Sequence, residues 1–113
     1  MVATDMVRIP SALLREANPA AAEGFAALRE AVRPGPLDRE TCEYILINGF
    51  ALAGFEEPFK IHAMRMLQEG VPKARLQHAV QISLGATAPL FPIVRALGWL
   101  EEVAAEHAAP PLP

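Results

Sequence analysis

A glutamate and a histidine, Glu43 and His62, are the residues of this sequence whose types and spacing could perform acid–base chemistry. Both lie in apolar stretches that we expect to be helical, on either side of a turn at Ala53-Gly54. An α-helix rises about 1.5 Å per residue, which places Glu43 roughly 16 Å from the turn and His62 roughly 12 Å from it. Because these offsets differ by only a few ångströms, the carboxylate and the imidazole can share a proton directly or through one water molecule.

His62 is the group that we expect to exchange the proton, since an imidazole inside a protein can do so near neutral pH. Decarboxylation of a lactone acid, or isomerisation beside its carbonyl, requires such a proton donor. The carboxylate of the substrate also requires a cation. Arg65 and Arg95 are the candidates, because a guanidinium can bind a carboxylate through two hydrogen bonds. Arg39 and Lys60 are weaker candidates.

Each of these residues also has a structural interpretation, which the sequence leaves open. His62 could be a hydrogen-bonded core histidine, Glu43 could pair with a surface Lys or Arg at the border of the core, and the two arginines could be solvated charges on helix faces. His78 is expected to point away from the core and to take no part in chemistry. The three histidines lack the spacing of metal ligands, so we expect no metal and no other cofactor.

Two helices, expected over residues 38–53 and 56–70, position the glutamate and the histidine. Asp38 is a favourable N-cap for the first helix, Gly54 ends it, and Gly70 ends the second. The first helix is apolar nearly all round, and at 100° per residue its main apolar face consists of Cys42, Ile45, Leu46, Gly49, Phe50 and Ala53. The second helix has an apolar stripe of Phe59, His62, Ala63, Met66 and Leu67. This stripe places His62 on the core side of its helix.

Further helices are expected on both sides of this pair. A short helix over residues 11–16 precedes one over residues 19–32, for which Asn18 is the N-cap; two more follow over residues 72–83 and 89–106. No β-strand alternation is sustained. The sequence predicts an all-α, compact bundle of about five to six helices built on an antiparallel helix pair. We expect an N-terminal arm with a short helix over residues 1–17, one helical domain over 18–106 and an extended tail over 107–113.

The last expected helix is apolar on two sides. One side carries Leu90, Ile93, Val94, Leu97 and Leu100, and the other carries Pro92, Ala96, Trp99 and Val103. A single small core offers a partner to one side only. We therefore expect a homo-oligomer, with Trp99 at the contact between subunits.

The composition limits the classes of partner. The chain has 113 residues, is 52% apolar and 20% charged, and carries a formal net charge of −3. This profile indicates one globular domain and gives no basic footprint for nucleic acid. The single cysteine, Cys42, cannot form an internal disulfide or a Cys-x-x-Cys pair. Because we find neither a signal-peptide pattern nor a membrane span, we expect a cytoplasmic protein.

The sequence also resembles the carboxymuconolactone decarboxylase family, which includes the alkylhydroperoxidase-D-like proteins. The resemblance covers about residues 37–100. Its most specific part is the spacing from Glu43 to His62, with the segment GF-EE-PFKIH at the turn between the two helices. The other matching features are Leu37, the turn at Ala53-Gly54, Glu56 and the terminal Gly70-Val71, with weaker support from Gly85 and Pro89.

This resemblance implies a small all-α protein that assembles into trimers or hexamers, with sites near the subunit contacts. In the peroxidase branch a Cys-x-x-Cys pair precedes the histidine, and here those positions hold Phe55 and Pro58. Peroxide reduction through a disulfide needs two thiols, so we do not expect that activity. The decarboxylase branch retains the histidine without the cysteines. The resemblance therefore implies that His62 is the acid or base and that Glu43 polarises it.

We accordingly expect a cofactor-free lyase of the lactone decarboxylase type, or a proton-transfer relative, acting on a small carboxylated substrate. This interpretation predicts a pocket that holds His62, with Glu43 within reach and an arginine at the rim. A non-catalytic oligomeric protein of the same fold is the alternative, and it predicts that Phe59 and Met66 seal His62. A thiol-dependent peroxidase that uses Cys42 is the least favoured alternative, and it predicts an exposed thiol.

Overall fold

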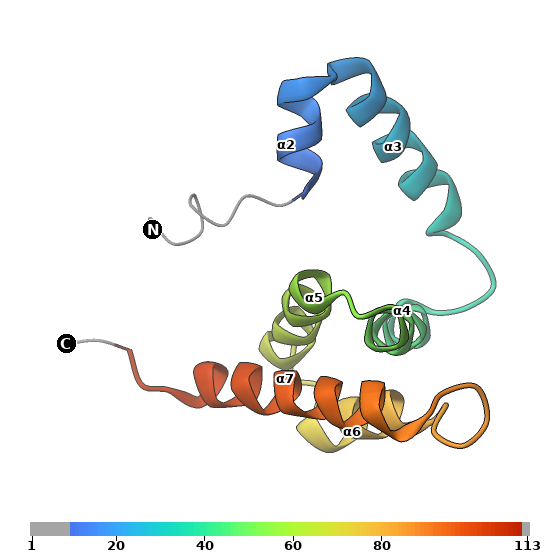
Figure 1. Cartoon of the computed structure of the whole chain (residues 1–113). Coiled ribbons are helices and arrows are strands. Elements are labelled where there is room, and N and C mark those ends of the chain that lie inside the picture. Colours follow the sequence, from blue (N-terminus) through green and yellow to red (C-terminus); the bar gives the residue numbers. More distant parts are fainter. Residues whose placement is uncertain (1–9, 112–113) are drawn as a thin grey trace. The chain divides into compact units, whose positions relative to one another are not determined.

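The computed structural model describes residues 10–111, and every regular element within that range is an α-helix (Figure 1). The helices are α2 (Pro10–Ala17), α3 (Pro19–Val32), α4 (Arg39–Ala53), α5 (Glu56–Gln68), α6 (Lys73–Gln81) and α7 (Leu90–Ala108). Between α6 and α7 the backbone makes one isolated bridge, from Leu84 to Ala88. The predicted all-α class is confirmed. Most of the expected N-terminal arm and the end of the expected tail lie outside the described residues.

The chain separates into two compact units, of which the first ends at Leu37 and the second begins at Asp38. In the first unit, α2 and α3 pack against each other and meet at Asn18, whose side chain accepts a hydrogen bond of 3.0 Å from the backbone N–H of Ala21. Ala22 is buried, whereas the large apolar residues of α3 are exposed: Phe25, Leu28 and Val32. This division groups α3 with α2, while the sequence grouped it with the later helices.

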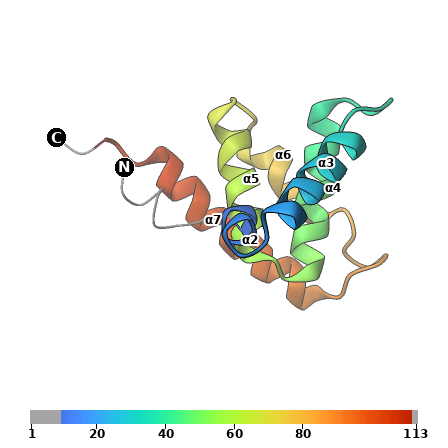
Figure 2. The same cartoon turned by 90° about the horizontal axis from the view of Figure 1, so that it is seen from above.

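The second unit is built on the antiparallel pair α4 and α5, which lie side by side (Figure 2). Asp38 caps the start of α4, because its Oδ1 accepts a hydrogen bond of 2.7 Å from the N–H of Thr41. Hydrogen bonding with the side chain of Thr41, and then with its backbone N–H, lowers the pKa of Asp38. Gly54 ends α4 in the left-handed conformation at φ 78°, which a residue with a side chain adopts only under strain. The short turn that results returns the chain directly into α5.

The core of the second unit lies where α7 crosses α5 and α4, with α6 packed against α4 and α7 (Figure 1). Phe59, Met66 and Leu76 are among its largest fully buried side chains. The predicted stripe of α5 is confirmed, because four of its five members are buried and His62 lies at the edge. α5 is therefore fixed in rotation by its own core residues.

The structure corrects the predicted face of α4. The residues that α4 buries are Glu43, Ile47 and Ala51, whereas Ile45, which we expected on the apolar face, is 56% exposed. A helix that is apolar nearly all round has no unique apolar face, so periodicity alone could not determine its rotation. The buried face includes a carboxylate, which no hydrophobicity pattern would select.

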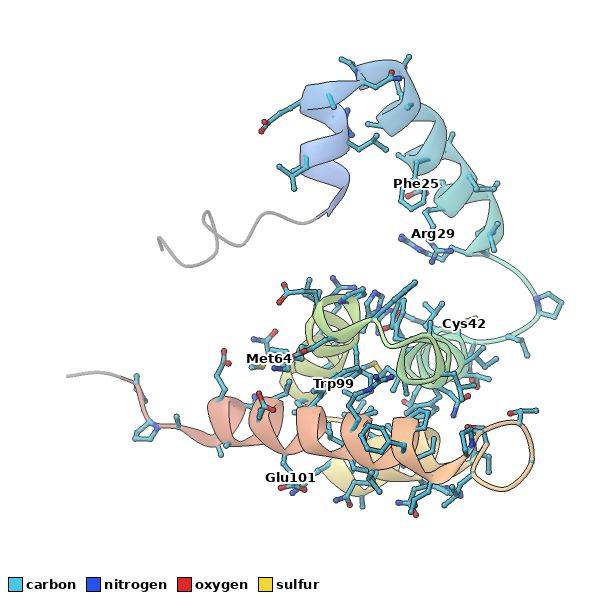
Figure 3. All side chains as sticks on the ribbon, viewed as in Figure 1. Phe25, Arg29, Cys42, Met64, Trp99 and Glu101 are labelled. Atoms are coloured by element: carbon cyan, nitrogen blue, oxygen red, sulfur yellow. The ribbon has the colours of Figure 1, made fainter. Side chains whose placement is uncertain are left out.

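The structure also defines which side of α7 is buried. One stripe enters the core, and it combines members of both predicted faces: Ile93, Ala96, Trp99, Leu100 and Val103. Trp99 is 8% exposed and packs edge-on against Phe59, with 5.4 Å between the ring centroids. Figure 3 shows Trp99 on the side of α7 that faces α5 and Glu101 on the opposite side. The large apolar residues that α7 leaves exposed are Leu90, Phe91 and Val94. A subunit contact at Trp99 stays a prediction.

Among residues 10–111, no helix combines the length and the apolar character needed to span a lipid bilayer.

Candidate acid–base site

The side chains of Glu43 and His62 are in direct contact. His62 Nδ1 lies 2.7 Å from Glu43 Oε1, which is within hydrogen-bonding distance. An ionised carboxylate can only accept hydrogen bonds, so with Glu43 in that state Nδ1 carries the hydrogen and donates it. The imidazole then has its second nitrogen, Nε2, available for other partners. The direct contact predicted from the helix spacing is therefore present.

The two side chains differ in their exposure to solvent. The side chain of Glu43 is 11% exposed, and that of His62 is 21% exposed. Glu43 belongs to the buried face of α4, one turn before Ile47, so the packing of α4 holds the carboxylate inside the unit. A buried carboxylate is stable only with a hydrogen-bonding partner, and His62 supplies one. The imidazole remains partly exposed to solvent.

The ring of Phe50 fixes the orientation of the imidazole from one side. Its centroid lies 5.1 Å from that of His62, with 49° between the planes. Phe50 is seven residues after Glu43 and therefore lies on the same side of α4, two turns further along. The imidazole is thus held between a hydrogen bond to Glu43 and an aromatic contact with Phe50.

Arg39 is a cation close enough to Glu43 for the charge of that carboxylate to affect it. It lies one turn before Glu43 on α4 and binds Glu69 through two hydrogen bonds, of 2.5 and 2.9 Å. The hydrogen bonds to Glu69 raise the pKa of Arg39, and the negative charge of Glu43 adds to this effect. The sequence ranked Arg39 as a weaker candidate for binding a substrate carboxylate.

The structure does not bring Arg65 and Arg95, the preferred candidates, into contact with Glu43 and His62. Arg65 is exposed on α5, one turn after His62, and makes no ion pair within the described residues. The guanidinium of Arg95 lies 5.2 Å from the centroid of the Trp99 ring. It also lies against the turn between α4 and α5, where a Cβ added to Gly54 would be 3.0 Å from Nη2. Arg95 is therefore held by an aromatic ring and a turn, and substrate binding by either arginine stays a prediction.

The remaining residues bear on the alternatives drawn from the sequence. Phe59 and Met66 are fully buried, yet they leave His62 partly exposed. At the positions of the cysteine pair, Phe55 is exposed on the turn and Pro58 lies half-buried in the first turn of α5. Cys42 is half-buried on α4. In the part of the chain that the structure describes, no three His, Cys, Asp or Glu side chains cluster as metal ligands.

Comparisons of this chain with protein-family models, curated proteins and solved structures found no match. Membership of the carboxymuconolactone decarboxylase family therefore stays a prediction from the sequence. The most specific element of the resemblance is the separation of 19 residues between Glu43 and His62, which the α4–α5 pair converts into a direct contact.

A cavity of about 440 Å³ lies between α4 and α6, which we call the α4–α6 cavity. It is lined by Thr41, Tyr44, Ile45, Asn48, Arg75, His78, Ala79 and Ile82. Thr41, Tyr44 and Asn48 are the polar residues that α4 contributes to this lining, and local sequence signals gave no partner for them. His78, expected to be idle, is exposed and lies in the lining. The cavity includes neither residue of the acid–base pair.

Proposed function

We propose that this chain is a cofactor-free acid–base enzyme of the carboxymuconolactone decarboxylase type. In this proposal His62 transfers a proton to or from a small carboxylated lactone or a related acid. The observation that supports it is the contact of 2.7 Å between His62 and Glu43, made by a partly open imidazole and a nearly buried carboxylate. A glutamate that accepts from one nitrogen of a histidine leaves the other nitrogen to exchange a proton with a substrate.

The chemistry assigns a role to each side chain. Loss of carbon dioxide from an unsaturated lactone acid leaves an electron pair that spreads onto the carbonyl group, and a proton must then be delivered to carbon. His62 Nε2 would deliver this proton, while Glu43 would hold the tautomer and stabilise the imidazolium. A general acid placed in this way contributes about 10²–10⁴-fold to a rate. Glu43 is a positioning residue in this scheme, because it acts through the imidazole.

The proposal also needs a cation for the carboxylate of the substrate. Arg65 and Arg95 keep this role as proposals, and Arg39 joins them because of its position beside Glu43. We further propose a cytoplasmic homotrimer or homohexamer, because members of the family that the sequence resembles assemble with sites near subunit contacts. Leu90 and Phe91, exposed on α7, would contribute apolar area to such a contact.

The test is a screen of muconolactone-like acids for release of carbon dioxide by the full chain. For an acid that is turned over, His62→Ala should lower kcat by at least about 100-fold while helicity and assembly are unchanged. Glu43→Gln should lower kcat less, because the imidazole remains. His107→Ala is the matched control, since His107 is an exposed histidine at the end of α7.

Two results would count against this function. Full activity of a normally assembled His62→Ala variant would contradict the mechanism directly. Absence of turnover by the wild-type chain over the whole series of acids would support the alternative, a non-catalytic helical protein.

A further inference from the structure

The α4–α6 cavity lies on the opposite side of α4 from the acid–base pair. At 100° per residue, its α4 residues Tyr44, Asn48 and Ile45 lie roughly 100–200° around the helix from Glu43. Its volume of about 440 Å³ falls within the range of pockets that hold small molecules. A ligand in this cavity would therefore be separated from His62 by the body of α4.

Hydrogen bonds from one side chain fix the two walls of the cavity relative to each other. Asn48 Nδ2 of α4 lies 2.9 Å from the carbonyl oxygen of Ala79 and 3.3 Å from that of Val80, both on α6. The same nitrogen lies 2.9 Å from Ser83 Oγ. Because these contacts hold α6 at a set distance from α4, the cavity is preformed and need not be opened by a ligand.

Two polar side chains, Glu40 and Tyr44, orient the guanidinium of Arg75 at this cavity. The hydroxyl of Tyr44 donates to Glu40 at 2.6 Å, and Arg75 Nη1 donates to the same Glu40 oxygen at 2.7 Å. Burial and the hydrogen bond to Glu40 raise the pKa of Tyr44, which keeps its phenol protonated. A guanidinium has five N–H donors, so the bond to Glu40 leaves donors of Arg75 for a ligand. His78, one turn after Arg75 on α6, adds a ring nitrogen to the same lining.

We infer that the α4–α6 cavity is a binding site for a small apolar carboxylic acid. The ionisable side chains that can become positively charged in its lining are Arg75 and His78, and no lining residue is acidic. The rest of the lining offers aliphatic surface, chiefly Ile45 and Ile82, which are 56% and 64% exposed. An acid with an apolar body would cover these side chains and place its carboxylate against the guanidinium of Arg75. A guanidinium can bind a carboxylate through two parallel hydrogen bonds.

This inference goes beyond the proposed function, because the site shares no residue with the acid–base pair. The two can therefore fail independently. A molecule bound in the α4–α6 cavity would be a ligand held apart from His62, and its binding needs no turnover.

The test uses one apolar body with three head groups. We would titrate the full chain with 4-phenylbutyrate, 4-phenylbutanol and 4-phenylbutylamine, following the amide resonances by NMR. The acid should bind at least about tenfold more tightly than the alcohol or the amine. Its shifts should fall on residues 41–48 and 75–82. Butyrate, which has the same head group without the ring, should bind more weakly than the full acid.

Two variants and a control test the assignment of roles. Arg75→Gln should weaken binding of the acid about tenfold while leaving the alcohol unchanged. Ile82→Asp places a carboxylate at an exposed position of the lining, so it should weaken the acid and strengthen the amine. Lys73→Gln is the matched control on the same helix, since Lys73 binds Glu101 at 2.7 Å and does not line the cavity.

Three outcomes would overturn the inference. The first is equal affinity for the acid, the alcohol and the amine. The second is a set of shifts centred on His62 that disappears in His62→Ala, because the acid would then occupy the acid–base site. The third is that a second copy of the chain covers the cavity. In that case the wild-type chain would be an oligomer that Ile82→Asp dissociates, and neither the wild-type chain nor the variant would bind the acid.

Discussion

Replacing Glu43 and His62 by alanine, singly and together, measures the free energy that couples the two side chains. A hydrogen bond that involves a charged group contributes about 1.5–3 kcal/mol to stability. The contact is 2.7 Å long and the carboxylate is nearly buried, which favours a large value, whereas the partial exposure of His62 reduces it. We therefore expect a coupling free energy of about 1–2 kcal/mol.

The single variants should differ in a characteristic way. His62→Ala removes the partner of a buried carboxylate and should lower the free energy of unfolding by about 1–3 kcal/mol, in addition to the loss of the contact with Phe50. Glu43→Ala leaves an imidazole that solvent can partly reach, so its unpaired nitrogen should cost less. The double variant should therefore be more stable than the sum of the two single effects predicts.

The assay is urea denaturation followed by the fluorescence of Trp99, the single tryptophan of the chain. Its ring lies in the core of the second unit, so its emission reports the unfolding of the unit that contains the pair. A control cycle that combines Glu43→Ala with His107→Ala should be additive within about 0.3–0.5 kcal/mol. A coupling free energy of that same small size for Glu43 and His62 would refute the contact on which the site is based.

Three further predictions concern stability. Gly54→Ala forces a side chain into the left-handed conformation at φ 78° and should lower the free energy of unfolding by about 1–2 kcal/mol; an unchanged urea midpoint would contradict this. Gly98→Ala should raise the free energy of unfolding by about 0.5–1 kcal/mol in the same assay. Gly98 is exposed within α7, and a Cβ added there meets nothing within 4 Å. Hydrogen bonds to Glu102 and Glu56 raise the pKa of Lys60. The contribution of Lys60 to the free energy of unfolding is therefore fully present below its ordinary pKa of 10.5, and it is lost as the pH rises through the pKa of the folded state. Lys60→Gln should cost about 0.5–1 kcal/mol at neutral pH, and the difference from wild type should shrink in strong alkali; a pH-independent difference would show that the ion pairs are not its cause.

Local sequence signals predicted the positions of the helices. Asn18 and Asp38 accept the capping hydrogen bonds expected of them, and Gly54 adopts the left-handed conformation that ends α4. Each of these signals depends on a few adjacent residues. The bounds of the helices follow from such short-range interactions and could therefore be read from the sequence alone.

The rotation of α4 and the partners of α7 could not be predicted in the same way. α4 is apolar nearly all round, and its rotation is set by α5, α6 and α7 together. The contact of Glu43 with His62 was predicted from distances along two helices and a turn. The contact of Asn48 with α6, and with it the α4–α6 cavity, depends on residues 31–35 positions apart, for which the sequence carries no local signal.

The division of the chain at Leu37 and Asp38 has a consequence for how the molecule tolerates damage and rearrangement. The acid–base pair, the α4–α6 cavity and the tryptophan all follow Asp38 in one uninterrupted stretch of backbone. A protease that cut the exposed connection at Arg33, or a gene fusion that exchanged everything before it, would leave every ionisable group discussed above on the same fragment. The acid–base pair and the α4–α6 cavity would therefore remain together on one fragment after such a cut or exchange.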